Sequence, residues 1–140
     1  MTYRLAVPGD IAAMSAIRLA VTENVLSDPS KVTAQMYRDY MDTLGRAWVC
    51  EADGKVVGFC YAVRDDASIW ALFLDQSYER LGIATELLDL ACAWLREIGK
   101  DCAYLSTTPD TRADRFYAAR GWQRSAPGMK EVHFSKSLQE

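Results

Sequence analysis

The chain has 140 residues and a formal charge of −3 at pH 7, and half of its residues are hydrophobic. This length suits a single domain over residues 1–140 with one sizeable core. The acidic charge balance disfavours general nucleic-acid binding, which requires a concentrated basic face. No run approaches the roughly 20 apolar residues of a membrane-spanning helix, so we expect no membrane partner.

The cysteines and the single histidine do not suggest a metal site. Cys50, Cys60, Cys92 and Cys102 lie inside apolar segments without a C-x-x-C pair, and one histidine cannot complete a zinc-ligand pattern. We therefore predict free thiols of a reducing compartment and no bound metal. The amino-terminal stretch MTYRLAVPGD lacks the basic and apolar regions of a signal peptide, so we expect a cytoplasmic protein.

The first third of the chain predicts one strand followed by two helices. Residues 3–7 alternate apolar and polar side chains as a strand does, and a Pro-Gly pair then breaks the pattern. Asp10 can cap the helix that follows. Thr33 can cap a second helix, which we expect to end at Gly45.

The rest of the chain predicts a strand meander followed by alternating helices and strands. Asp53-Gly54 is a strong signal for a hairpin turn between two apolar runs. The expected elements are strands at 47–52, 55–63 and 68–74, a helix at 83–98, a strand at 102–107, a helix at 111–120 and a strand at 131–138. The order β-α-α-β-β-β-α-β-α-β predicts an α/β fold of the α+β kind, with one mixed sheet of six or seven strands and helices packed on both faces.

The segment SYERLGIATELL, residues 77–88, joins the strand at 68–74 to the following helix. The first N–H groups of a helix lack intrahelical partners, and the helix dipole adds roughly half a positive charge there. Gly82 has no β-carbon to keep a ligand from the backbone, and Arg80 adds a cation. These features favour a phosphate site. The segment lacks the lysine of a P-loop and the glycines of a dinucleotide site, and a plain tight turn is the alternative.

The same segment resembles motif A of the GNAT superfamily of CoA-dependent N-acyltransferases, whose usual form is Q/R-x-x-G-x-G/A. The matching window runs from Glu79 to Ala84. A second segment, TPDTRADRFYAARGW, resembles motif B, N-x-x-A-x-x-x-Y-x-x-x-G-F, and the residues in register are Ala113, Tyr117, Gly121 and Trp122. Two motifs at the family's spacing, together with the element order, extend the resemblance over the whole chain.

The resemblance implies a fold and a cosubstrate. In the family a mostly antiparallel sheet has two central parallel strands that splay apart, here 68–74 and 102–107, with a β-bulge in the first. The pantetheine of acetyl-CoA pairs with the opened strand edge, here Leu72, Phe73 and Leu74. The pyrophosphate-binding loop corresponds to Arg80, Leu81, Gly82, Ile83, Ala84 and Thr85. Acetyl-CoA is thus the expected cosubstrate.

The resemblance also implies catalytic roles. Tyr117 matches the family's tyrosine, which contacts CoA and protonates the departing thiolate. A backbone N–H near Leu74 is expected to stabilise the developing oxyanion. The loop after the first helix covers the acceptor in the family, so Glu23, with Asn24 and Asp28 beside it, is expected to meet the amine. A solvated loop or a helix cap is the alternative for these three residues.

Two residues depart from the family's pattern. Glu79 replaces Gln or Arg beside the phosphates, and its charge weakens CoA binding unless it turns outward or pairs with Arg80. Asp110 stands for the asparagine that hydrogen-bonds pantetheine, and Thr107 or Thr108 could supply that bond instead.

These assignments predict an N-acetyltransferase that moves an acetyl group from acetyl-CoA to a primary amine of a small molecule or peptide, by direct attack in a ternary complex. The alternative is a degenerate GNAT fold that binds CoA or a protein partner without catalysis. Glu79 and Asp110 favour that alternative, and Tyr117 opposes it. A homodimer is compatible with both. Nothing in the residues selects among polyamines, amino acids, aminoglycosides and protein N-termini.

Overall fold

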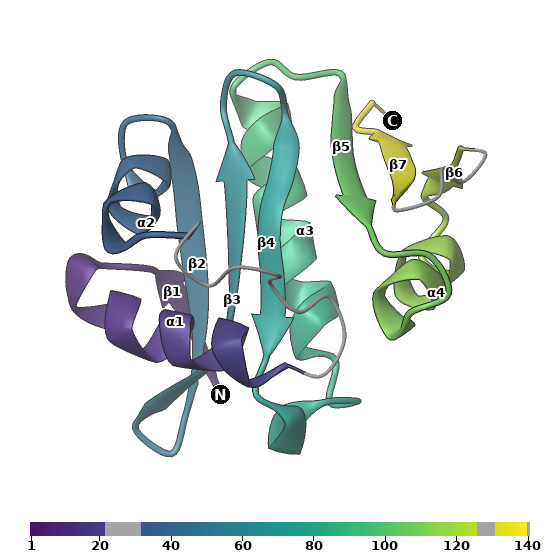
Figure 1. Ribbon diagram of the computed structural model, residues 1–140. Coiled ribbons are helices and arrows are strands. Elements are labelled where there is room, and N and C mark those ends of the chain that lie inside the picture. Colours follow the sequence, from purple (N-terminus) through teal and green to yellow (C-terminus); the bar gives the residue numbers. More distant parts are fainter. Residues whose placement is uncertain (22–31, 126–130, 140) are drawn as a thin grey trace.

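The computed structural model describes residues 1–21, 32–125 and 131–139 (Figure 1). Its elements are, in chain order, β1 (Thr2–Leu5), η1 (Pro8–Asp10), α1 (Ile11–Ala20), α2 (Ala34–Met41), β2 (Gly45–Ala52), β3 (Lys55–Val63), β4 (Ser68–Leu74), η3 (Gln76–Tyr78), α3 (Ile83–Glu97), β5 (Cys102–Thr107), α4 (Arg112–Ala119), β6 (Gln123–Arg124) and β7 (Val132–Ser137).

The strands form one seven-stranded sheet in the order β1-β2-β3-β4-β5-β7-β6. Neighbouring strands are antiparallel except β4 and β5, which run parallel. The β2–β3 hairpin turns at Asp53 and Gly54, which both have positive φ, as the predicted turn requires. The mixed, mostly antiparallel sheet is therefore confirmed. The short edge strand β6 and the 3-10 helices η1 and η3 are the elements that the sequence did not predict.

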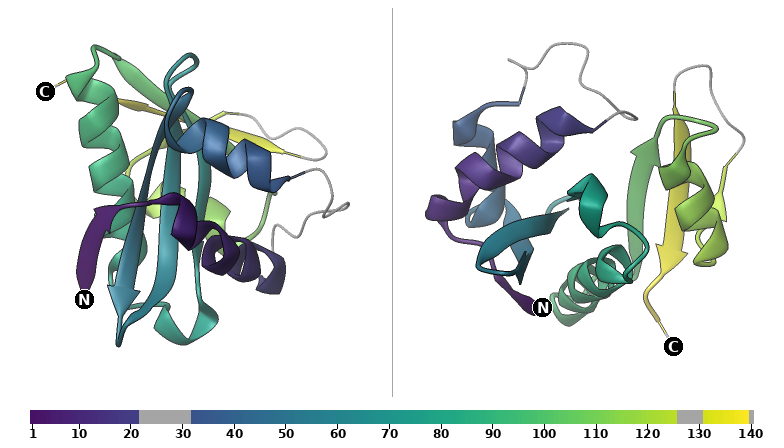
Figure 2. Two further views of the ribbon diagram at one scale, coloured as in Figure 1. Left: turned by 90° about the vertical axis from the view of Figure 1, so that its left-hand side faces the viewer. Right: turned by 90° about the horizontal axis from the view of Figure 1, so that it is seen from below.

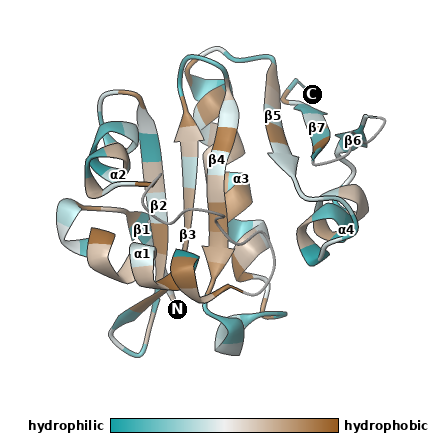
Figure 3. Cartoon of the chain, viewed as in Figure 1, coloured by the Kyte–Doolittle hydropathy of each residue, from teal (hydrophilic) through white to brown (hydrophobic). Residues whose placement is uncertain are grey.

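Helices cover both faces of the sheet (Figure 2). One core cluster joins the sheet to α3 and α4, and a second joins the other face to α1 and α2. Hydrophobic residues concentrate on the central strands β3 and β4 and on parts of α3 (Figure 3). Among the described residues, no helix has both the length and the apolar character needed to cross a membrane.

The two predicted helix caps behave differently. Thr33 caps α2, because its Oγ1 accepts a hydrogen bond from Met36 N at 3.2 Å. The prediction that Asp10 caps α1 is wrong: its carboxylate makes no capping bond to that helix. It instead accepts two hydrogen bonds from the guanidinium of Arg4, at 2.8 and 2.9 Å, and one from Val7 N at 2.8 Å. Asp10 therefore attaches the first helix to β1.

Gly45 begins β2 and does not end α2, which stops at Met41. A β-carbon on Gly45 would lie 2.1 Å from the carbonyl oxygen of Ala62 and 2.8 Å from that of Tyr40. Backbone atoms of β3 and of α2 thus leave room for glycine alone. The glycine marks a close backbone approach and not a helix end.

Strands β4 and β5 diverge after a single aligned pair, Ser68 and Tyr104, and Figure 1 shows them separating toward their carboxyl ends. In the pairing of β4 with β3, Trp70 has no partner residue on β3, and β4 therefore has a β-bulge at this position. Trp70 and Ala71 consequently pack on the same core cluster, on the α1 and α2 face. Adjacent side chains of a regular strand point to opposite faces. The predicted splay and bulge are both present.

Candidate active site

A cleft of about 680 Å³ opens where β4 and β5 separate. It is lined by β4, by the loop and first turn of α3, by the end of β5, by α4 and by the last part of α1. This volume lies within the range of roughly 300–1,000 Å³ found for small-molecule sites. Segments far apart in the sequence therefore meet at one site.

One edge of β4 faces the cleft. Asp75 N donates a hydrogen bond to Val57 O on β3 at 2.8 Å, so this N–H points toward β3. Backbone groups alternate in direction along an antiparallel strand. The N–H and C=O groups of Phe73 therefore face β3, while those of Leu72 and Leu74 face the edge that β5 leaves open. All three residues line the cleft, so the predicted strand edge lies where a ligand can reach it.

The amino-terminal end of α3 faces the same cleft. Glu86 N donates to Gly82 O at 3.1 Å, and the N–H groups of Ile83, Ala84 and Thr85 precede this bond. Gly82 has a φ of 81°, and a β-carbon there would meet no atom within 4 Å. Glycine adopts the left-handed backbone without the strain of a β-carbon, and the space beside it is open to a ligand. This end of the helix can therefore hold an anion.

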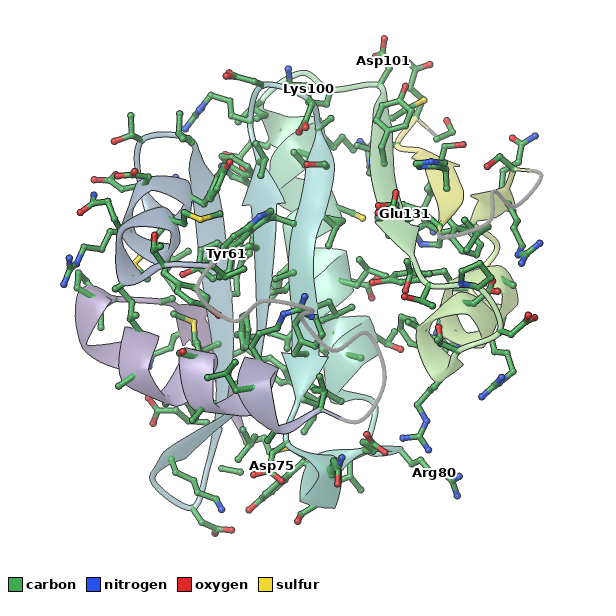
Figure 4. All side chains as sticks on the ribbon, in the orientation of Figure 1. Tyr61, Asp75, Arg80, Lys100, Asp101 and Glu131 are labelled. Carbon is green, nitrogen blue, oxygen red and sulfur yellow. The ribbon has the colours of Figure 1, made fainter. Side chains whose placement is uncertain are left out.

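The two residues before Gly82 take different places. Arg80 lines the cleft but is exposed, and Figure 4 shows its side chain pointing away from the fold. Its φ of 66° is uncommon for a residue with a β-carbon. Leu81 is 56% exposed and does not belong to the cleft lining. Of the predicted loop, Leu81 alone is placed away from the cleft.

Two contacts connect α4 with the side of the cleft where α3 begins. Glu79 forms an ion pair with Arg112, at the start of α4, where the sequence suggested Arg80. Arg120 Nε donates to Thr85 Oγ1 at 3.1 Å, between residues 35 positions apart. The carboxylate of Glu79 is thus matched by a cation. Sequence reasoning missed both arginines because only the packing of α4 opposite α3 brings them to the cleft.

Tyr117 lies on α4 and lines the cleft, although the residue is only 6% exposed. The ring packs against Trp122 and Phe134, with centroid distances of 5.6 Å to each. Burial raises the pKa of Tyr117 well above its ordinary value, and the thiols of Cys60 and Cys92 add to the rise. The hydroxyl therefore keeps its proton at neutral pH.

Asp110 does not line the cleft. Its backbone N–H donates to Asp114 Oδ2 at 2.9 Å, and its φ is 62°. Asn and Asp adopt this left-handed conformation more readily than other residues with a β-carbon, which explains the residue type without a ligand. Thr107 and Thr108 do line the cleft and remain candidates for the pantetheine bond.

The predicted acceptor side of the cleft is the side of α1. The residues predicted to meet the amine lie outside the described part of the chain: Glu23, Asn24 and Asp28. On this side the cleft is lined by Arg18 of α1, by Val21 directly after that helix and by Trp70 of β4. In the described ranges, no group of three or more His, Cys, Asp or Glu side chains is arranged to hold a metal ion.

Comparison with known proteins supports the fold. A search of curated protein sequences found no significant match. The chain resembles the structure of Ard1 from Thermoplasma volcanium, with 21% identity, a TM-score of 0.82 and coverage of 99% of this chain and 98% of that one. A GNAT-family acetyltransferase from Staphylococcus aureus Mu50 is similar, with 18% identity, a TM-score of 0.84 and 99% coverage of both chains. YncA from Salmonella typhimurium, solved with its cofactor acetyl-CoA, shares 17% identity, with a TM-score of 0.81 and coverage of 100% and 95%.

The sequence itself carries a family signature. Residues 13–122 match the acetyltransferase (GNAT) family, and this range includes the splayed strands β4 and β5, the predicted phosphate-binding loop and α4. The match spans more than half of the 140 residues and agrees with the structural likenesses. The chain therefore belongs to the acetyltransferase (GNAT) family.

Proposed function

We propose that this protein is an N-acetyltransferase that transfers an acetyl group from acetyl-CoA to a primary amine of a small molecule or peptide. The observation that carries the proposal is the continuity of one cleft from the open edge of β4 to the free N–H groups of α3. Membership of the family supports it, and so does the likeness to YncA, which was solved with acetyl-CoA.

The residues of the cleft fit acetyl-CoA. The backbone groups of Leu72 and Leu74 are free to pair with the amides of pantetheine, as an added strand would. The N–H groups of Ile83, Ala84 and Thr85 suit the pyrophosphate, and nothing occupies the space where a β-carbon of Gly82 would point.

Acetyl-CoA supplies an acyl group already activated as a thioester. A C–N bond forms to the amine, the C–S bond breaks, the amine loses a proton and the sulfur gains one. We assign the Leu74 N–H to the developing negative charge on the thioester oxygen. We assign the proton donation to Tyr117, which lines the cleft and stays protonated. A high pKa makes a reluctant donor, so this contribution is moderate.

The amine reaches the thioester from the α1 side in this proposal, and attack is direct within a ternary complex. Glu23 is proposed to attract the protonated amine, since a carboxylate first draws a cation at neutral pH. The cytoplasm is the proposed location, and a homodimer remains a prediction.

The second candidate is a CoA-binding module without catalysis. It is favoured by Glu79, a carboxylate lining the cleft beside the phosphate-binding loop. The ion pair with Arg112 weakens that argument, because it balances the charge.

Two measurements separate these functions. A thermal shift reports binding: acetyl-CoA at about a hundred times its Kd should stabilise the protein by roughly 2.7 kcal/mol. Release of free thiol with a panel of amines reports transfer. A shift without thiol release from any amine supports the module. The absence of a shift at millimolar acetyl-CoA contradicts the transferase and the CoA-binding module, and favours a degenerate fold that acts through a protein partner.

A further inference from the structure

The guanidinium group of Arg18 includes a buried nitrogen with an unusual environment. Its Nη1 is buried and has no hydrogen-bond partner, and among the described residues it is the one buried side-chain nitrogen or oxygen in this condition. The guanidinium carbon lies 4.0 Å from the centroid of the Phe73 ring. This stacking satisfies one face of the cation but none of its N–H donors.

Burial of such a cation is costly where water no longer solvates it, and among the described residues no carboxylate forms an ion pair with Arg18. Burial lowers the pKa of Arg18, and the nearby Tyr37 works in the opposite direction. Arginine nevertheless keeps its charge in proteins. A cation held in this way is suited to an anionic partner that arrives from outside the described chain.

The position of Arg18 separates it from the phosphate-binding residues. Phe73, on which it stacks, packs with the α1 and α2 core cluster, whereas Leu72 and Leu74 pack on the α3 side. Arg80, Arg112 and Arg120 belong to the α3 and α4 side of the cleft. Arg18 therefore lies on the side from which the acceptor is proposed to enter.

A small pocket of about 50 Å³ adjoins the cleft at Arg18. Its other walls are Val32, Tyr37, Trp70 and Ala71, and Arg18, Trp70 and Ala71 line the main cleft as well. Arg18 is the only cation among the described residues lining this small pocket. A single guanidinium between apolar walls suits a carboxylate, which it can bind through two parallel hydrogen bonds, better than a doubly charged phosphate.

We propose that Arg18 binds a carboxylate of the acceptor, and that the acceptor is therefore a small amine carrying a carboxylate, as amino acids do. This inference rests on the proposed transferase function. It narrows the acceptor class, because polyamines and aminoglycosides have no carboxylate and the N-terminal amine of a protein is followed by a peptide carbonyl.

The test compares each amino acid with its own primary amide, which keeps the amine and removes the carboxylate. Thiol release is measured at saturating acetyl-CoA for the parent, for Arg18→Met and for the control Arg64→Met. Arg64 also stacks on a ring, 5.2 Å from the Trp94 centroid, but does not line the cleft.

For at least one amino acid, the parent should have a kcat/KM about ten- to a hundredfold higher than it has for the corresponding amide. A difference of this size is expected when one charged hydrogen-bonded contact is lost. Arg18→Met should bring this ratio near one, mainly through the acceptor KM, with the KM for acetyl-CoA unchanged. Arg64→Met should keep the parent's ratio. The melting temperature of Arg18→Met should not fall, because methionine keeps apolar packing on Phe73 and removes the unpaired charge.

The inference is overturned if, in the parent, kcat/KM for the amino acid divided by kcat/KM for its amide is near or below one for every pair. It is also overturned if Arg18→Met keeps the parent's ratio. If Arg18→Met fails to fold, Arg18→Lys replaces it: the charge stays, the two-pronged geometry is lost, and the ratio should fall to an intermediate value. An unchanged ratio in Arg18→Lys also overturns it.

The proposed function fails separately, when acetyl-CoA produces no thermal shift in the parent. If acetyl-CoA binds but no amine is acetylated, thermal shifts of the CoA complex with amino acids decide. No additional shift from any amino acid overturns the carboxylate site.

Discussion

Gly82 illustrates how one backbone angle can leave space for a ligand at the start of a helix. The residue begins α3 in a left-handed conformation, beside open space. Gly82→Glu should abolish acetyl-CoA binding, because it fills that space and adds negative charge at the helix start. Gly82→Ala is the matched control: it carries the same backbone strain of about 1–2 kcal/mol but little bulk and no charge. Isothermal titration of both variants checks this prediction, and equal binding by Gly82→Glu and the parent would place the phosphates elsewhere.

Tyr117 offers a test of the proposed proton donation. Tyr117→Phe keeps the ring against Trp122 and Phe134 and removes only the hydroxyl. We expect kcat to fall by roughly one to three orders of magnitude, with acetyl-CoA affinity almost unchanged. Steady-state kinetics across the pH range provide the measurement. A kcat equal to the parent's at every pH would make the tyrosine structural.

At the scale of elements, α4 and the loop before α3 are joined by Glu79 and Arg112. Glu79→Gln should tighten acetyl-CoA binding, because it removes a carboxylate from the cleft and releases Arg112 from the ion pair. The gain should shrink at high salt, since both side chains are partly exposed and their charges are screened. Titration of acetyl-CoA at two salt concentrations tests this. Weaker binding by the variant would mean that the ion pair organises the site.

The sequence predicted strand and helix positions well where an apolar run is bounded by turn residues. The runs at 68–74 and 102–107 became β4 and β5 with unchanged bounds. It predicted poorly where distant backbone sets the requirement, as at Gly45, whose neighbours come from α2 and β3. The prediction that Asp10 caps a helix failed for the same reason, since Arg4 on β1 donates hydrogen bonds to the Asp10 carboxylate.

The residues of the candidate site also divide into those that the sequence predicted and those that it did not. The loop around Gly82 and the edge of β4 are continuous in sequence and could be found there, with the family resemblance as a guide. The arginines at positions 18, 112 and 120 come from helices separated in the chain, and no local pattern marks them. The bulge at Trp70 also has no local signal, because SIWALFL is apolar at every position after its serine.

At the scale of the whole molecule, burial of titratable groups sets the response to alkali. Burial raises the pKa of Tyr37, Tyr61 and Tyr117 above the ordinary value near 10, and that of the Cys60 and Cys92 thiols above 9. The unfolded chain then releases protons before the folded one does, so stability is complete below pH 9 and declines as the pH rises beyond it. Each group contributes up to about 1.4 kcal/mol per pH unit between its two pKa values. Urea unfolding between pH 8 and 11 should show this decline, with a shallower slope in Tyr117→Phe; a constant free energy of unfolding would contradict it.

The alternating direction of the β4 backbone has a consequence for exchange of amide hydrogens with solvent. Phe73 N–H points toward β3, so it should be protected in the free protein, whereas the amides of Leu72 and Leu74 face the edge that β5 leaves open and should exchange quickly. Acetyl-CoA lying along that edge should slow exchange at Leu72 and Leu74 and leave Phe73 almost unaffected. Amide hydrogen exchange measured residue by residue by NMR would then slow at every second residue along this part of β4. Binding would in effect extend the sheet by a strand that is not protein.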